Sequence, residues 1–401
     1  MEGDFIKINE WLKPLSWFYG LGVGIRNLLF DMGLRKSRSF KTPVVSVGNI
    51  TVGGTGKTPH VEYLIQLLQD RLRVAVLSRG YKRKSKGFLI ADDTMTISDI
   101  GDEPYQMKQK FPKVTVAVDK QRVNGILKLT DNDSKDSPVD VILLDDAFQH
   151  RQVKPGVNIL LVDYHRLIIY DCLLPAGRLR EPLTGKNRAD IVIVTKCPKD
   201  LKPMAYRVIT KAMALFPYQQ LFFSTLDYAP LRPVFDGVKA AGNINEPDVL
   251  KATNVLLLTG IASPRQIEED LTPRVKSITP LTFGDHHNFT PRDIERLNSL
   301  FDEMPTPKCI ITTEKDAARL VSTNGMSDDV RRHLYQQPVC ISFLLDQQTA
   351  FDQTIIGYVT KNSRRKPQTR RAGSKPAKPR QESSAKPRQE TSTKPQTISF
   401  R

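Results

Sequence analysis

A glycine-rich loop between a strand-like run and a helix-like run constrains this chain most. Residues 44–50 are rich in valine and isoleucine, which favours a strand, and residues 61–68 have the apolar content of a helix. Between the two runs stand Gly53, Gly54, Thr55, Gly56, Lys57 and Thr58. Such a loop directs backbone N–H groups and a helix N-terminus at phosphates, with the lysine on the outer phosphates and the threonine hydroxyl on Mg²⁺. The sequence therefore predicts a nucleoside triphosphate site rather than a flexible turn.

The entry of this loop departs from the phosphate-binding pattern. The pattern G-x-x-x-x-G-K-[ST] begins with glycine, and this chain has Thr51 at that position. The chain must therefore turn into the loop without a residue that adopts positive φ at low cost. We still expect residues 51–58, which include Val52, to form the nucleotide-binding segment.

Strand-like and helix-like runs alternate along most of the chain. In the first half, the strand-like runs are residues 44–47, 73–78, 114–118, 139–144, 157–162 and 191–195. The alternation predicts an α/β fold, a P-loop NTPase-like three-layer sandwich with a mostly parallel sheet. After residues 221–224, prolines and a stretch rich in Gly and Asn interrupt it. A second alternating unit follows at residues 255–260, 264–271, 275–281, 294–304, 309–313 and 339–345.

These patterns divide the chain into five expected parts. They are an apolar, membrane-associated segment at 1–35, a P-loop nucleotide-binding domain at 36–225, a linker at 226–250, a smaller α/β lobe at 251–360, and a basic tail at 361–401. A chain of 401 residues is long enough for two lobes with their own cores. Its four cysteines are scattered without a C-x-x-C pair, which is typical of a reduced, cytosolic protein.

Positive charge is concentrated at the C-terminal end. Residues 361–401 hold thirteen Lys and Arg against two Glu, and so carry +11 of the net charge of +17. This segment is poor in apolar residues and contains the near-repeats AKPRQESS and AKPRQETS, at residues 377–384 and 385–392. Such a composition predicts disorder. A solvated tail, contact with an anionic membrane and contact with RNA are all compatible with it.

The N-terminal end carries an apolar segment. Residues 11–30 hold only Lys13 and Arg26 as charges and contain both tryptophans of the chain. A helix that spans a bilayer needs about 20 predominantly apolar residues, but Pro14 and three glycines interrupt this segment. A monotopic helix at the membrane interface fits better, with a buried first helix as the alternative. The charge order is not that of a secretory signal.

Two acids follow a strongly apolar run. Residues 139–144 are followed by Asp145 and Asp146, and four hydrophobic residues before an acid are typical of a Walker B strand. Such a strand presents a carboxylate to Mg²⁺ or its waters. Adjacent aspartates after a strand can also simply begin a turn. Paired with the glycine-rich loop, the acids favour a metal site.

Four other fragments place polar side chains near the ends of expected elements. They are Gly101-Asp102-Glu103-Pro104, Ser78-Arg79-Gly80-Tyr81, the proline-bounded loop at residues 175–182 with Arg180 and Glu181, and Asp285-His286-His287. Open α/β sheets keep their sites at the carboxyl ends of strands, and arginine binds phosphate in a bidentate manner. Each fragment alone is also compatible with a surface turn, and an isolated histidine pair is more often structural.

Together, and in this order, the fragments resemble one family. GNITVGGTGKTP is followed by SRGY, GDEP, DD-x-FQH, LPAG-x-LREP, VTK and TTEKD. This combination resembles the tetraacyldisaccharide 4'-kinases of lipid A biosynthesis over residues 11–345. Ala147 stands where that family usually has glycine, and the basic repeat tail is no part of the family pattern.

The resemblance implies a kinase that moves the γ-phosphate of ATP, with Mg²⁺, to the 4'-hydroxyl of a tetraacyldisaccharide 1-phosphate. The product would be the 1,4'-bisphosphate. The acceptor is a lipid A precursor glycolipid, met at the cytosolic face of the inner membrane. We accordingly expect a peripheral or monotopic protein that is monomeric and binds no nucleic acid.

The resemblance also assigns roles to individual residues. It gives Lys57 and Thr58 to the triphosphate and Mg²⁺, and it adds Glu103, Asp145 and Asp146 as further ligands of the metal or its waters. Asp102 is the expected base, and His286 is the partner that orients it when the second lobe closes over the site. Positions implicated in phosphate and acceptor binding are matched by Arg79, Arg122, Arg180 and Glu181, with Arg180 also expected to act in catalysis.

Two alternatives come from other classes. One is a P-loop GTPase or ATPase that acts as a switch or as a membrane-associated chaperone. Val194-Thr195-Lys196 resembles half of the guanine-reading motif N/T-K-x-D. Pro198 stands where that motif needs a carboxylate, which favours ATP. A nucleic-acid-binding ATPase is suggested by the tail, but the aromatic residues concentrate in the N-terminal segment rather than beside basic clusters in the lobes.

Overall fold

A nine-stranded, mostly parallel sheet forms the centre of the larger lobe. The computed structural model describes residues 8–131, 139–235, 244–261, 264–285, 287–321 and 323–363. The strand order is β14-β8-β7-β6-β1-β5-β2-β4-β3, and only β3 and β14 pair in antiparallel fashion. The strands are β1 (Val44–Gly48), β2 (Val74–Ser78), β3 (Leu89–Ile90), β4 (Thr115–Val118), β5 (Val141–Asp145), β6 (Val157–Asp163), β7 (Ile191–Thr195), β8 (Gln220–Tyr228) and β14 (Val339–Phe343).

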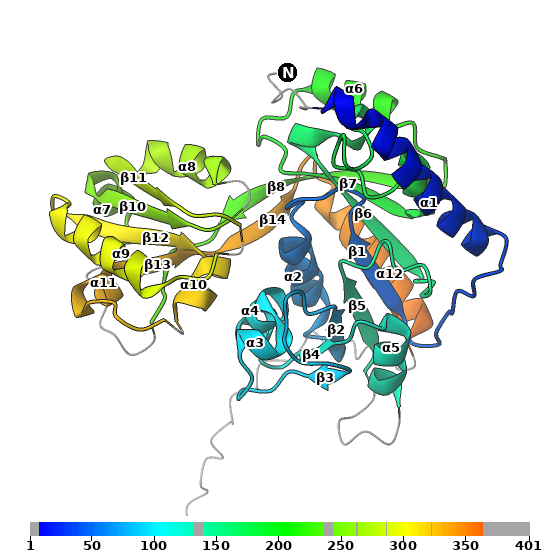
Figure 1. Cartoon of the computed structure of the whole chain (residues 1–401), viewed down its shortest axis with the longest axis horizontal. Coiled ribbons are helices and arrows are strands. Elements are labelled where there is room, and N and C mark those ends of the chain that lie inside the picture. The colour runs from blue at the N-terminus through cyan, green and yellow to red at the C-terminus, as the bar shows by residue number, and fades with distance from the viewer. Residues whose placement is uncertain are drawn as a thin grey trace, which may run out of the picture. The chain divides into compact units, whose positions relative to one another are not determined.

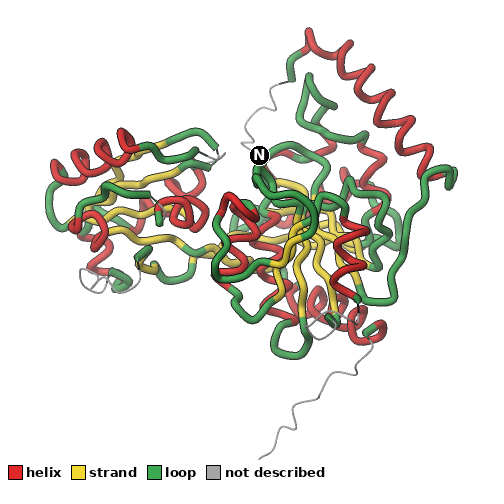
Figure 2. Tube along the Cα trace, turned by 60° about the horizontal axis from the view of Figure 1, so that its bottom comes forward, coloured by secondary structure: helices red, strands yellow, loops and turns green. Residues whose placement is uncertain are grey.

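Helices cover both faces of this sheet, which makes the three layers that the sequence predicts (Figure 2). One face packs against α2 (Lys57–Leu68), α4 (Asp102–Lys110) and α12 (Gln348–Asn362), and the other against α5 (Arg122–Thr130) and α6 (Pro203–Met213). In β5, Val141 and Leu143 point to the first face and Ile142 and Leu144 to the second. Because both faces are buried, the strands are continuously apolar.

A five-stranded sheet forms the smaller lobe, in the order β11-β10-β12-β13-β9 (Figure 1). Its strands are β9 (Arg232–Pro233), β10 (Asn254–Thr259), β11 (Ser277–Thr282), β12 (Lys308–Thr313) and β13 (Leu334–Gln337). Its helices are α7 (Pro247–Ala252), α8 (Arg265–Leu271), α9 (Pro291–Glu303), α10 (Glu314–Leu320) and α11 (Asp328–His333). The predicted α/β class with a second, smaller lobe is confirmed.

The last two elements differ from the expected extent of the smaller lobe, residues 251–360. Strand β14 pairs with β8 in the larger sheet, and α12 packs on that sheet. Phe343 of β14 stacks on Phe351 of α12 with ring centroids 4.4 Å apart, and Phe222 of β8 lies edge-on to both rings. The expected linker at 226–250 instead contains the end of β8, strand β9 and the start of α7. An apolar strand pattern reports burial but does not report which sheet the strand joins.

Helix α1 (Lys13–Asp31) follows a short 3₁₀ turn at Glu10–Leu12 and leaves many apolar side chains in solvent. Trp11 is 93% exposed, Trp17 80% and Phe18 75%. The opposite side is anchored by Ser16, whose hydroxyl accepts the Ala176 N–H at 3.0 Å and donates to the Leu173 carbonyl at 3.0 Å. The remaining short helices are α3 (Ile97–Ile100), Tyr164–Arg166, Ile168–Tyr170, Leu183–Arg188 and Thr272–Arg274.

Among the described residues, no helix combines the length and the apolar content that crossing a bilayer requires. The basic repeats of the tail lie outside the described residues.

Candidate functional site

The glycine-rich loop joins the end of β1 to α2, which begins at Lys57. Its two glycines in the left-handed region are Gly53 at φ +117° and Gly56 at φ +80°. Buried polar contacts hold the loop from behind, because Asn49 Nδ2 donates to Thr55 Oγ1 at 2.9 Å and Thr195 Oγ1 donates to the Thr55 carbonyl at 3.0 Å. The loop therefore has the fixed shape that a phosphate cradle requires.

The missing first glycine has a structural explanation. Thr51 forms an isolated antiparallel bridge with Leu179, and the Val52 N–H donates to the Arg178 carbonyl at 2.8 Å. Thr51 is not among the residues with positive φ. The turn that glycine allows elsewhere is replaced here by pairing with the loop at residues 175–182.

A buried histidine, His60, fastens the loop to the sheet. Its Nδ1 lies 2.7 Å from the Gly56 carbonyl and its Nε2 lies 3.0 Å from Ser224 Oγ on β8. Burial lowers the pKa of His60 to about 4, so the ring is neutral at physiological pH. The neutral ring donates to the carbonyl and accepts from the hydroxyl, which fixes its tautomer.

The two acids after β5 lie beside the loop. Lys57 Nζ is 3.6 Å from Asp146 Oδ1, and Arg180 Nη1 is 3.6 Å from Asp146 Oδ2. Asp145 is fully buried. Its burial, together with the nearby carboxylates of Glu103 and Asp146, raises the pKa of Asp145 to about 7. Asp146 adopts φ +46°, whereas Ala147 does not have a positive φ, so alanine fits the turn at this position.

The carboxylate oxygens of Asp145 and Asp146 suit a divalent cation that nucleotide phosphates also help to hold. Asp145 Oδ1 and Asp146 Oδ1 are buried and have no hydrogen-bond partner among the described residues. The described residues contain no group of three or more His, Cys, Asp or Glu side chains arranged as a complete metal site. Mg²⁺ is typically bound by one or two carboxylates plus substrate phosphates. An incomplete protein site with two carboxylate oxygens that accept no hydrogen bond from the described residues, one of them facing Lys57, therefore suits Mg²⁺ bound together with a nucleotide.

Asp102 and Glu103 are the first two residues of α4. The preceding residue, Gly101, has φ +91°, and a Cβ there would lie 2.9 Å from the Tyr81 carbonyl oxygen, so only glycine fits. Arg319 of α10 donates to Asp102, and Lys315 of the same helix pairs with Glu103 at 3.0 Å. The expected partner of Asp102, His286, lies outside the described residues.

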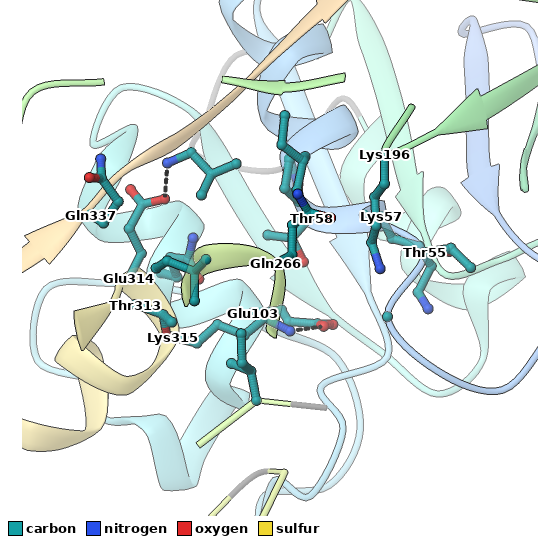
Figure 3. Close-up of a pocket in the computed structure, with 18 of the residues that line it drawn as sticks. Thr55, Lys57, Thr58, Glu103, Lys196, Gln266, Thr313, Glu314, Lys315 and Gln337 are labelled. Carbon is teal, nitrogen blue, oxygen red and sulfur yellow. Dashed lines mark hydrogen bonds and ion pairs between the residues drawn. The ribbon is translucent and has the colours of Figure 1, made fainter. Parts of the chain in front are cut away.

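A cavity of about 230 Å³ lies next to the loop (Figure 3). Polar residues that line it include Lys57, Thr58 and Glu103 together with Thr313, Glu314 and Lys315 from β12 and α10. The apolar lining residues include Leu226, Tyr228, Ile261, Ile267 and Val339. Polar groups beside a phosphate loop together with apolar lining residues suit a nucleotide.

Of the four residues expected to contact the acceptor, two are at least partly exposed and two are buried. Arg79 is exposed at the end of β2, and Arg180 is partly exposed beside Asp146. Glu181 is buried and pairs with Arg188 at 2.8 Å. Arg122 is 2% exposed, and its guanidinium donates to the carbonyls of Asp119 at 2.8 Å and Asp145 at 3.2 Å. This arrangement favours a supporting role for Arg122 at the end of β5.

Sequence reasoning missed the residues that α10 brings to the site, Lys315 and Arg319. The fragment TTEKD is part of the family pattern, but the pattern assigns no role to its charges. The sequence carries one signal for this pair, the spacing of Lys315 and Arg319, because positions four apart on a helix share one face. Asn49, which follows β1 and donates to Thr55 of the loop, is a second residue whose role the sequence does not predict.

Comparisons with known proteins point to one family. A family model for Tetraacyldisaccharide-1-P 4'-kinase matches residues 8–359. The tetraacyldisaccharide 4'-kinase of Phocaeicola vulgatus is 57% identical over 366 residues, covering 91% of this chain and 99% of that protein. The one from Bacteroides thetaiotaomicron is 53% identical over 369 residues, covering 91% of this chain and 97% of that protein.

A solved structure supports the same conclusion. The crystal structure of an "apo" form of LpxK from Aquifex aeolicus in complex with ATP is 30% identical to this chain, with a TM-score of 0.65. The match covers 87% of this chain and 98% of that one. Shared sequence, shared fold and the phosphate loop lead to one assignment. This chain belongs to the tetraacyldisaccharide-1-P 4'-kinase family.

Proposed function

We propose that this protein transfers the γ-phosphate of ATP to the 4'-hydroxyl of a tetraacyldisaccharide 1-phosphate and forms the 1,4'-bisphosphate, the activity that its relatives' names describe. The observation that carries the proposal is the corner formed by the phosphate loop and the end of β5, where Lys57 lies 3.6 Å from Asp146, the residue directly after β5. Catalysis of phosphoryl transfer depends mainly on positioning of the reacting groups and on neutralisation of the phosphate charge. This corner supplies both.

ATP is expected to occupy the cavity with its phosphates on the loop and its base against the apolar lining residues. Lys57 then exchanges its contact with Asp146 for the outer phosphates. The residues that would hold Mg²⁺ are Thr58, Asp145 and Asp146, with Glu103 near enough to act on the same ion or its waters. When bound, Mg²⁺ neutralises phosphate charge.

Asp102 is the proposed base. Its carboxylate accepts the proton of the 4'-hydroxyl as that oxygen forms a bond to the γ-phosphorus. The bond from this phosphorus to the bridging oxygen breaks, and ADP leaves with the electron pair. His286 is proposed to orient Asp102, while Arg79 and Arg180 are proposed to face acceptor or transferred phosphate.

Helix α1 is the proposed contact with the membrane. Its exposed apolar side chains, including Trp17 and Phe18, suit the interface between headgroups and acyl chains. Its inner side is anchored near the loop at residues 175–182, where Tyr19 Oη donates to the Arg180 carbonyl at 2.8 Å. We propose that the protein is a peripheral monomer on the cytosolic face of the inner membrane, where the acyl chains of the acceptor remain in the lipid.

The direct test is incubation of the purified full chain with γ-labelled ATP, Mg²⁺ and tetraacyldisaccharide 1-phosphate in detergent micelles. Chromatography of the lipid should show a labelled, doubly phosphorylated product. Lys57→Ala should abolish the product, because the outer phosphates lose their cation. Lys113→Ala, which changes an exposed lysine after α4, is the matched control and should keep the parental rate. Absence of labelled lipid with the parental chain would refute the proposal.

A further inference from the structure

We propose that Arg319 is a positioning residue that holds the base Asp102 from the smaller lobe, an inference that rests on the proposed function. Arg319 lies on α10, and its side chain is 6% exposed. One arm of its guanidinium donates to Asp102 on α4, and the other lies 3.1 Å from Asp316 Oδ1. The two carboxylates it joins belong to different lobes.

The smaller lobe fixes the position of Arg319 through Asp316. Asp316 is fully buried. Its carboxylate accepts the Gly260 N–H at 2.8 Å, directly after β10, and the Thr313 hydroxyl at 2.7 Å, at the end of β12. The carboxylate is thus tied to the ends of two neighbouring strands. The guanidinium that it orients is consequently held in place before it reaches Asp102.

A second pair repeats this contact one helical turn earlier. Lys315 and Arg319 are four residues apart on α10, and they meet the consecutive acids Glu103 and Asp102 of α4. Lys110, also on α4, pairs with Glu314 at 2.9 Å. Three ion pairs therefore join the two helices, and Arg319 makes the one that reaches the proposed base.

The pairing has consequences for the chemistry of Asp102. A guanidinium favours the ionised form of a carboxylate, which is the form that accepts a proton. It also restricts the carboxylate to one orientation, and orientation is a large part of catalysis by positioned groups. Because Arg319 shares its charge with Asp316, it attracts Asp102 less strongly than an arginine with one partner would. Asp102 is thereby oriented while it remains able to accept a proton.

The linkage also makes the placement of the base depend on the smaller lobe. The turn at Gly101, where only glycine fits, fixes the backbone position of Asp102, and Arg319 fixes the position of its carboxylate. Catalysis then requires α10 to be docked on α4, even though Arg319 does not line the cavity.

Kinetic comparison of Arg319 variants tests this role in the purified full chain. Arg319→Met removes the charge and keeps the aliphatic stem, and it should lower kcat by about 30-fold or more while the KM for ATP stays within about twofold. Arg319→Lys keeps a cation but lacks the planar fork that joins two carboxylates, so it should lose less of kcat than Arg319→Met loses without reaching the parental value. Lys110→Met removes the cation that pairs with both Glu314 of α10 and the buried Glu62 of α2. It is the control for loss of docking and of stability without a change at Asp102, and its kcat is expected to stay within about threefold.

Two results would overturn the positioning role. One is a kcat for Arg319→Met within about threefold of the parental value. The other is equal damage by Arg319→Met, Arg319→Lys and Lys110→Met with a matching fall in unfolding temperature, which would mean that the residue only holds the lobes together. Should Arg319→Met not fold, Arg319→Gln keeps N–H donors without charge and carries the same expectation. A parental chain that makes no bisphosphorylated lipid refutes the proposed function itself, whereas an active parent with an equally active Arg319→Met refutes only this inference.

Discussion

Lys57 Nζ lies 3.6 Å from Asp146 Oδ1, so the lysine of the phosphate loop is paired with the second acid after β5. Arg180 approaches the other oxygen of the same carboxylate at 3.6 Å. Asp146 therefore lies between two cations that phosphate groups also attract. Binding of ATP and Mg²⁺ must redistribute these contacts, and this makes Asp146 and its neighbour Asp145 sensitive positions.

Asp146→Asn should raise the Mg²⁺ concentration needed for half-maximal activity by about tenfold or more, because one charge of the proposed metal corner is lost. A Mg²⁺ titration of kinase activity at fixed ATP measures this shift. Asp248→Asn, at an exposed position of α7, is the matched control and should leave the titration unchanged. A superimposable titration for Asp146→Asn would exclude it from the metal site.

Asp102→Asn should lower kcat by about 10² to 10⁴, because a general base contributes on that order. The affinity for ATP should stay within about twofold, since Asp102 is assigned to the acceptor hydroxyl rather than to the nucleotide. Steady-state kinetics and a nucleotide-binding titration measure the two quantities separately. Near-parental turnover would assign the base to another residue.

Trp17→Ala combined with Phe18→Ala should weaken binding to phospholipid vesicles by about tenfold or more, because two large apolar side chains no longer enter the interface. Sedimentation with vesicles of mixed neutral and anionic lipids measures the bound fraction. Met204 is also largely exposed, at 70%, but lies on α6. Met204→Ala is therefore the control for loss of apolar surface, and equal weakening by both changes would argue against α1 as the contact.

The stability of the protein should depend on pH through Glu62. Burial raises the pKa of Glu62 from its ordinary 4.5 to about 7, with Glu314 adding to the effect and Lys110 opposing it. Between these values the folded chain keeps the Glu62 proton and the unfolded chain loses it, so the contribution of Glu62 to the free energy of unfolding falls as the pH rises. Above pH 7 both forms are ionised and the decline ends.

Glu62→Gln should remove this contribution, so the unfolding free energy at pH 8 relative to pH 5 should be roughly 2 kcal/mol higher in the variant than in the parental chain. Denaturant titrations at the two pH values measure the change. Glu295→Gln, at an exposed position of α9, is the control and should retain the parental slope. A Glu62→Gln chain whose unfolding free energy changes between pH 5 and pH 8 by the same amount as that of the parental chain would contradict the raised pKa.

Local sequence was sufficient for the parts of the site that lie within one stretch of chain. The strand, the glycines and Lys57 of residues 44–58 specify a phosphate loop by themselves, because backbone conformation there depends on adjacent residues. The apolar run before Asp145 and Asp146 likewise predicted a buried strand with carboxylates at its end. Both are found as predicted.

Other assignments depended on partners far along the chain. Residues 339–343 have the apolar pattern of a strand in either lobe, and packing of Phe343 against Phe351 and Phe222 decides for the larger sheet. Arg122 was predicted as an acceptor contact, but it is buried against the carbonyls of Asp119 and Asp145. Sequence shows that a residue is charged and does not show what surrounds it.

The contact between Asp102 and Arg319 is the clearest case, since it joins residues 217 positions apart. No spacing rule connects them, because helix and strand periodicities act over a few residues only. The sequence by itself determined the nucleotide loop, the α/β class and the family pattern. Only the tertiary structure decided which charges meet across the two lobes, because ion pairs between distant segments form after the cores of both lobes have placed their helices.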